Sequence, residues 1–147
     1  MKKIVYLLVI LLILTGCTKE EKPVEEIEYD IPNGVVETMR INISGNEYIV
    51  NLIDSDTSRL LVSYLPQEFQ MQEKNRNEKY VYLSFTLPTN EEKVNKIEKG
   101  DVMLYENNCL VVFYKSFETT NSYTKIGHID DLPNLGNDNI VMRFYKW

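Results

Sequence analysis

Hydrophobic and polar residues alternate along much of the sequence beyond residue 36, as they do in half-buried β-strands. The alternation is regular over residues 39–43 and resumes over residues 48–52. Gly45-Asn46 separates the two runs and is a two-residue turn signal. These features predict a β-hairpin over residues 39–52.

A helical pattern follows this hairpin. Apolar residues recur at helical spacing over residues 56–65, which places them on one face of a helix. Asp54-Ser55-Asp56 offers an N-cap and an acidic first turn, and Pro66 cannot continue a helix. The sequence therefore predicts one short amphipathic helix over residues 56–65.

The rest of the chain shows mostly β patterns. Strands are predicted at residues 69–72, 80–83, 102–105, 109–114, 123–129 and 140–145. Turn or loop signals separate them at residues 75–77, 87–90, 106–108 and 133–136. Many short strands and one helix in roughly 110 residues are typical of a small closed β-barrel. The predicted fold class is therefore mainly β.

The first 17 residues differ from the rest. Lys2 and Lys3 form a short positive segment, and residues 4–14 are an unbroken apolar run too short to cross a bilayer of about 30 Å as a helix. The run ends in Leu14-Thr15-Gly16-Cys17, which resembles the lipobox of bacterial lipoproteins. In those proteins the chain is cleaved before the cysteine, which then carries a diacylglycerol and acyl groups such as palmitate. An ordinary signal peptide or an uncleaved anchor is the alternative interpretation.

The lipoprotein interpretation divides the chain into three parts. Residues 1–16 are the predicted signal peptide, residues 17–36 a lipidated cysteine with a flexible acidic tether, and residues 37–147 the barrel domain. The tether is charged and contains two prolines, features that oppose a packed core. An acidic interaction segment is the alternative. Cys17 would hold the protein on the lipid bilayer of the cell membrane, with the domain outside the cytoplasm.

Composition and charge narrow the possible functions. The 147 residues are 44% hydrophobic and 26% charged, as in a globular protein. The net charge of −6, with scattered Lys and Arg, argues against a nucleic-acid partner. Removing Lys2 and Lys3 with the signal peptide would take this charge to −8, so acyl chains rather than a basic patch would hold the protein on a membrane.

Cysteine and histidine are scarce. The sequence has two cysteines and one histidine, too few for a structural zinc site, and no metal or cofactor is predicted. Lipidation of Cys17 would leave Cys109 as the remaining free thiol, so no intramolecular disulfide is expected. Cys109 lies in an apolar run, which favours a buried, inert thiol over a reactive nucleophile.

Several short segments occur in an order that resembles a known family. They are the hairpin of residues 39–52, Ser58-Arg59-Leu60-Leu61 with Leu65-Pro66, Glu78-Lys79-Tyr80, Lys99-Gly100-Asp101-Val102, Asn108-Cys109-Leu110-Val111-Val112-Phe113-Tyr114 and Gly127-His128-Ile129. Their order and spacing resemble a bacterial family of small cyclophilin-like proteins over about residues 39–145. The resemblance implies a cyclophilin-like β-barrel with a shorter helical complement.

The same resemblance raises the question of peptidyl-prolyl isomerase activity. True cyclophilins surround a proline pocket with an arginine, a glutamine, phenylalanine and methionine. Here Met103 and Phe113 are candidates for the pocket methionine and phenylalanine, with a place in the core as the alternative. No arginine is near residues 85–88, and residues 108–113 lack the glutamine. A shared fold does not by itself carry the activity over.

Few side chains are suited to catalysis. Isomerisation of an X-Pro bond has a barrier of about 20 kcal/mol, and lowering it needs a cation or donor beside an apolar slot. Arg40 and Arg143, on predicted strands, are candidates, and surface ion pairs are the alternative. His128 would carry any general acid–base role, and Asp130 and Asp131 follow it, but no Ser or Cys is spaced to complete a triad.

Tyrosine is the most informative residue type. Ten tyrosines are many for this length, and a group of them falls in the predicted strands: Tyr80, Tyr82, Tyr105, Tyr114 and Tyr123. Tyrosine joins apolar area to a polar tip, which suits a groove for a peptide or small ligand, although β-propensity is an alternative reason for its presence.

The sequence therefore predicts non-catalytic binding of a peptide, protein or small ligand, with an extracytoplasmic peptidyl-prolyl cis-trans isomerase as the alternative. The residues predicted to form the groove are Arg40, Tyr80, Tyr82, Met103, Tyr105, Phe113 and His128.

Overall fold

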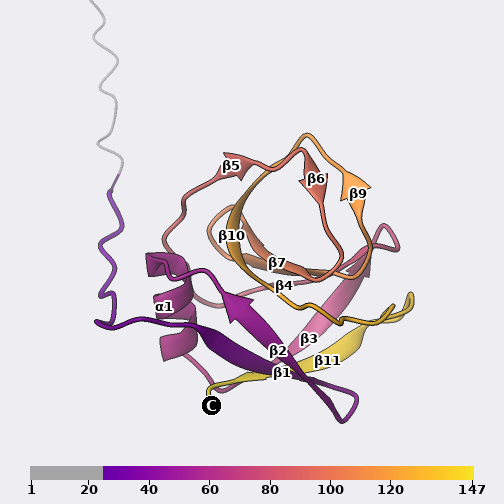
Figure 1. Ribbon diagram of the computed structural model, residues 1–147. Coiled ribbons are helices and arrows are strands. Elements are labelled where there is room, and N and C mark those ends of the chain that lie inside the picture. The colour runs from indigo at the N-terminus through magenta and orange to yellow at the C-terminus, as the bar shows by residue number, and fades with distance from the viewer. Residues whose placement is uncertain (1–24) are drawn as a thin grey trace, which may run out of the picture.

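A computed structural model of the chain describes residues 25–147 and shows eleven strands and one helix in that part (Figure 1). In chain order these are β1 (Thr38–Ile43), β2 (Asn46–Leu52), α1 (Asp56–Ser63), β3 (Gln67–Lys74), β4 (Glu78–Tyr82), β5 (Glu92–Lys93), β6 (Lys96–Ile97), β7 (Asp101–Tyr105), β8 (Cys109–Phe113), β9 (Phe117–Glu118), β10 (Ser122–His128) and β11 (Ile140–Tyr145).

Eight strands form a closed antiparallel barrel. They are hydrogen-bonded in the order β2-β1-β11-β3-β4-β8-β7-β10, and β10 pairs with β2 to close the ring. Closure leaves no long unpaired edge, the usual weak point of an all-β protein. The predicted mainly-β closed barrel with one short helix is confirmed.

The first hairpin shows how local sequence sets the register. Ser44 and Gly45, between β1 and β2, both have positive φ, at 52° and 85°. A two-residue loop with positive φ at both positions matches the right-handed twist of the strands that it joins. The hairpin prediction is confirmed, but its turn lies at Ser44-Gly45 and not at Gly45-Asn46, because Ser44 rather than Asn46 takes the left-handed conformation.

A glycine allows the barrel to close. The register of β10 against β7 shifts between Lys125 and Gly127, and Gly127 then pairs with Leu52 of β2. A Cβ atom at Gly127 would lie 2.4 Å from the carbonyl oxygen of Asn51, closer than a side chain can approach. The absence of a side chain at residue 127 therefore lets the two strands meet.

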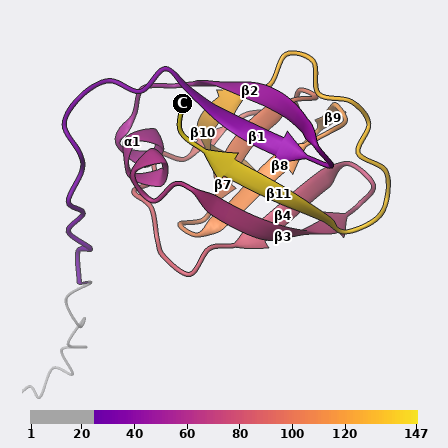
Figure 2. The ribbon, with the colours of Figure 1, turned by 90° about the horizontal axis from the view of Figure 1, so that it is seen from below.

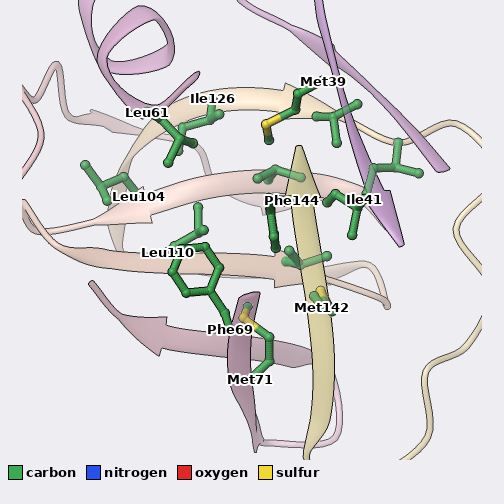
Figure 3. Close-up of a cluster of buried hydrophobic side chains, with 14 of the residues drawn as sticks. Met39, Ile41, Leu61, Phe69, Met71, Leu104, Leu110, Ile126, Met142 and Phe144 are labelled. Carbon is green, nitrogen blue, oxygen red and sulfur yellow. The ribbon is translucent and has the colours of Figure 1, made fainter. Parts of the chain in front are cut away.

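The barrel interior is a single hydrophobic core, and α1 covers one end of it (Figures 2 and 3). Leu60 and Leu61 of α1 are buried in this core. The Ser55 side chain caps the helix by accepting a hydrogen bond from the backbone N–H of Ser58, as predicted. The helix ends at Ser63, two residues before the predicted end.

A buried ion pair lies inside the barrel and contacts the loop between β10 and β11. In Figure 2 this loop passes the barrel end opposite α1. The Lys79 side chain is fully buried, and its Nζ lies 2.5 Å from Oε2 of Glu73. The same Nζ donates to the carbonyl oxygens of Gly136 and Asp138 at 2.7 and 2.6 Å. The Tyr114 hydroxyl donates to the Glu73 carboxylate. Every polar group of this cluster therefore has a partner.

β8 is buried on both of its faces. Its inward side chains join the core. Its outward ones, with side chains of β6, β7 and β10, form a second cluster comprising Ile97, Met103, Cys109, Val111, Phe113 and Tyr123. The short strands β5, β6 and β9 lie together outside the barrel near this cluster (Figure 1). The sequence did not predict these three strands, because two residues are too few to show an alternation.

The segment before β1 contacts the barrel. Tyr29 packs against the core, and its hydroxyl lies 3.2 Å from both the Thr86 hydroxyl and the Leu87 carbonyl oxygen. Ile31 also packs there. The predicted signal peptide and Cys17 lie outside the described residues, and the boundaries at residues 16 and 36 stay predictions. Within residues 25–147, no helix is long and apolar enough to span a membrane.

Candidate functional site

The outer face of β4, β8 and β7 brings tyrosines together. Alternation along β4 places Glu78, Tyr80 and Tyr82 on one face. The register pairs Tyr82 of β4 and Tyr105 of β7 with the same β8 residue, Cys109. The two tyrosines therefore flank one cysteine across three adjacent strands.

These side chains line a pocket of about 170 Å³, which we call the tyrosine pocket. Its lining residues are Lys74, Asn75, Glu78, Tyr80, Tyr82, Tyr105, Cys109, Val111, Phe117, Asn121 and Tyr123. The pocket thus contains four tyrosines and one phenylalanine, and its lining residues come mainly from five barrel strands, β3, β4, β7, β8 and β10, and from the segment after β8. This volume suits a small chemical group better than a whole peptide.

The rings of the tyrosine pocket are arranged edge to face or tilted. Tyr80 and Tyr82 have their ring centroids 5.8 Å apart with an interplanar angle of 78°. Tyr105 and Tyr123 lie 5.7 Å apart at 55°. Such geometries are favourable for aromatic pairs. Tyr82 is 63% exposed, so one wall of the pocket is open to solvent.

Glu78 supplies a buried acid to the tyrosine pocket. The residue is 8% exposed, and no hydrogen bond or salt bridge to its carboxylate exists among residues 25–147. Burial raises the pKa of the Glu78 carboxyl above its ordinary value, opposed in part by the charge of Lys74. The carboxylate oxygens are not among the fully buried polar atoms that lack a partner, so they keep some exposure to solvent. A largely buried carboxylate without a charged partner is nevertheless unfavourable, and ligand-binding sites are one place where such groups occur.

Lys74 lies at the rim of the same pocket. Its Nζ is 5.9 Å from the centroid of the Tyr80 ring, within the range of a cation–π contact. The side chain is exposed and lies farther than 4 Å from the Glu78 carboxylate. A tyrosine face of this pocket therefore already has an ammonium group beside it, while the acid remains unpaired.

Cys109 is the buried thiol of the pocket floor. It is 5% exposed, and burial raises the pKa of its thiol to about 11. Because the thiolate is the nucleophile, only about one thiol in a thousand would be reactive at pH 8. The structure thus agrees with a buried, inert residue.

We expect Cys109 in the folded protein to react with iodoacetamide at pH 8 at least about a hundredfold more slowly than the same residue in guanidinium-unfolded protein. Burial and the raised pKa both lower the rate. Mass spectrometry of the peptide that contains Cys109 would measure it over time. Equal rates in the folded and unfolded states would mean that the pocket floor is open.

A second pocket, of about 280 Å³, holds the predicted histidine. Nδ1 of His128 lies 2.9 Å from Oδ1 of Asp101, whereas its Nε2 is 3.8 Å from Asp130. The partner that orients the ring is therefore Asp101, 27 residues earlier in the chain, and not the adjacent Asp130 or Asp131. None of the ten residues lining this pocket is Ser, Thr or Cys, the usual nucleophiles.

The two candidate arginines lie elsewhere. Arg40 is on β1, in the wall opposite β8 in the barrel order, with its guanidinium 3.8 Å from the Trp147 ring and 3.5 Å from Glu47. Arg143 on β11 bonds Glu68 at 2.6 Å. Both side chains have surface partners, and neither lines the tyrosine pocket.

The residues predicted as one groove therefore separate into distinct places. Tyr80, Tyr82 and Tyr105 share the tyrosine pocket, while Met103 and His128 line the second pocket. Phe113 is fully buried and Met103 is 3% exposed, which agrees with the alternative that both belong to the core.

Sequence reasoning missed the acid of the pocket and the partner of the histidine. The predicted strand at residues 80–83 begins after Glu78, so the sequence did not place Glu78 beside Tyr80. The available signal was that the two residues are two positions apart, because residues at that spacing lie on the same face of a strand. Nothing in the sequence indicates that Asp101 is the hydrogen-bond partner of His128, because the two residues are 27 positions apart. Among residues 25–147, no group of three or more His, Cys, Asp or Glu side chains is placed to hold a metal ion.

Comparison with known proteins identifies two features. Residues 41–144 match the cyclophilin-like family, and residues 1–18 match the prokaryotic membrane lipoprotein lipid attachment site. These matches confirm both resemblances that the sequence indicated. No curated protein matches the chain.

A solved structure has the same fold. The solution structure of a hypothetical protein from Archaeoglobus fulgidus superimposes with a TM-score of 0.53 at 18% sequence identity. The match covers 78% of this chain and 98% of the archaeal one. At this level of identity the likeness shows the fold alone.

Proposed function

We propose that this chain, which belongs to the cyclophilin-like family and is a membrane-anchored lipoprotein, is a non-catalytic binding protein that displays its barrel outside the cytoplasm. The observation that supports binding is the tyrosine pocket, where three predicted tyrosines meet a buried acid. A pocket of about 170 Å³ would receive a side chain of a peptide or protein, or a small ligand.

Peptidyl-prolyl isomerase activity is the alternative function. A pocket holding Arg40 or Arg143 beside Met103 and Phe113 would favour it, because isomerisation needs a donor next to an apolar slot. Phe113 is instead fully buried. The arginines lie on β1 and β11, whereas Met103 and Phe113 lie on β7 and β8. The family match is the remaining support for this alternative.

A single experiment compares the two functions. The full-length protein, in a maltoside detergent, would be mixed with a panel of short peptides, some containing X-Pro bonds, and followed by NMR. We expect chemical-shift changes at Tyr80, Tyr82 and Tyr105 without accelerated cis–trans exchange, and their loss in Tyr82→Ala. The exposed Tyr64 is the matched control: its own signals should not shift in the wild type, and Tyr64→Ala should keep the shift changes at Tyr80, Tyr82 and Tyr105.

Three results would contradict the proposal. Exchange of the proline isomers well above the uncatalysed rate would make the protein an isomerase. Shift changes confined to the second pocket, around His128, or no changes with any peptide, would show that the tyrosine pocket does not bind this class of ligand.

A further inference from the structure

The tyrosine pocket combines two features that act on the same kind of ligand. Aromatic ring faces carry partial negative charge and attract a cation within about 6 Å of the ring centroid. A carboxylate attracts the same cation through its full charge. Tyr80, Tyr82, Tyr105 and Tyr123 supply the rings, and Glu78 supplies the acid. Neither feature favours an anion.

Glu78 is the acid of the pocket, and no side chain of the described residues pairs with it. Its residue is more than nine-tenths buried, it lines the pocket, and it has no hydrogen bond or ion pair in the described part of the chain. Glu73, by contrast, has Lys79 as its ion-pair partner and the Tyr114 hydroxyl as a further donor. A cation from outside would give Glu78 the partner that Glu73 already has.

Size and charge further restrict the ligand. About 170 Å³ admits an ammonium group with a short hydrocarbon stem, and the apolar floor of Val111 and Cys109 would cover such a stem. A strongly hydrated metal ion would need several oxygen ligands, whereas the pocket has one carboxylate among rings. The net charge of −6 also favours the approach of cations.

From these observations, and resting on the proposed binding function, we propose that the tyrosine pocket binds an organic ammonium group, with the tyrosine rings around the cation and Glu78 as its counter-ion. Both a lysine side chain of a peptide and the quaternary headgroup of a choline-like molecule have this chemistry. Lys74, beside the Tyr80 ring, competes with the ligand for the negative surface of the pocket.

Titration with small probes would test the proposal. The full-length protein would be kept in a maltoside detergent and phosphate buffer, because ammonium headgroups and amine buffers would occupy the pocket. The probes are choline, its uncharged carbon analogue dimethylbutanol, and butylammonium as a mimic of a lysine side chain. Tyrosine ring NMR signals would give the affinity and the location of each probe.

We expect both cations to shift the signals of Tyr80, Tyr82 and Tyr105, and dimethylbutanol to bind at least about tenfold more weakly. The ratio of choline to butylammonium affinity would distinguish a methylated headgroup from a lysine side chain as the natural source. Glu78→Gln should weaken both cations at least about tenfold without changing the affinity for dimethylbutanol.

Two variants serve as matched comparisons. Lys74→Met should tighten cation binding about twofold to threefold, because it removes a competing positive charge. Glu106→Gln makes the same charge change as Glu78→Gln at an exposed residue outside the pocket, and should alter affinity less than twofold. Glu78→Gln should remain folded, because it removes a buried charge and keeps the shape of the side chain; its thermal unfolding would be measured alongside.

The possible failures can be told apart. If dimethylbutanol binds as well as choline, or if Glu78→Gln leaves cation binding unchanged, the ammonium assignment is overturned and the pocket remains a binding site for neutral groups. If no cation binds but peptides from the panel still shift the tyrosine signals, the assignment is again wrong and the proposed function stands. If neither probes nor peptides reach the pocket, both proposals fail.

Discussion

Replacing Lys79 by methionine should lower the free energy of unfolding by about 3–5 kcal/mol, the usual cost of removing one partner of a buried ion pair. The Lys79 side chain is fully buried and its Nζ donates to Glu73 and to two loop carbonyls. Without the ammonium group, the Glu73 carboxylate would keep the Tyr114 hydroxyl as a donor but would lose its counter-charge. The carbonyls of Gly136 and Asp138 would also lose their donor.

Chemical denaturation monitored by circular dichroism would measure this loss. Lys115→Met is the matched control, since Lys115 is exposed and should change stability by less than about 0.5 kcal/mol. The double variant Lys79→Met with Glu73→Gln should recover part of the loss, because no unpaired charge then remains buried. A loss below about 1 kcal/mol in Lys79→Met would mean that water reaches and solvates Glu73.

The second large effect is expected in the barrel core. Phe144→Ala should cost about 3–5 kcal/mol, because it removes a fully buried ring from the inner face of β11. The Phe144 ring meets that of Phe69 on β3, with centroids 5.4 Å apart at 67°, and the neighbouring side chains in Figure 3 come from several barrel strands. The surrounding wall is closed by hydrogen bonds and can collapse only partly into the cavity.

Thermal unfolding would report this loss as a decrease in Tm of roughly 10–25 °C for a domain of this size. Val141→Ala on the same strand is the control, because Val141 faces outward and is 38% exposed. A similar decrease in both variants would indicate that β11 is sensitive to any change, and would contradict the packing explanation.

Some elements could be predicted because local and tertiary preferences agree. The alternation in β1 and β2 and the cap at Ser55 are visible in the sequence and are present in the structure. The beginning of β4 was missed for a physical reason: Lys79 is charged, so it counts as polar, yet it is buried with its partner Glu73. An ion pair between side chains of two different strands cannot be recognised from the hydrophobic–polar alternation of either strand alone.

The candidate site was predictable to a similar extent. The tyrosines of the pocket could be named because they fall on predicted strands and join apolar area to a polar tip, but their grouping depends on register. Tyr82 and Tyr105 become neighbours because both pair with Cys109, and that requires the order β4-β8-β7. The sequence shows His128 followed by Asp130 and Asp131, whereas its hydrogen-bond partner in the barrel is Asp101 of β7.

The place of β11 in the barrel has a consequence for the order of synthesis. β11 lies between β1 and β3, so that Arg40 pairs with Tyr145 across almost the entire length of the domain. A chain that emerges amino terminus first, from a ribosome or through a translocation channel, exposes β1 and β3 long before their shared partner exists. Contacts of such long sequence separation form late and slowly. The barrel wall therefore cannot close until β11 has emerged, so the eight-stranded ring forms only when almost the whole domain has been synthesised.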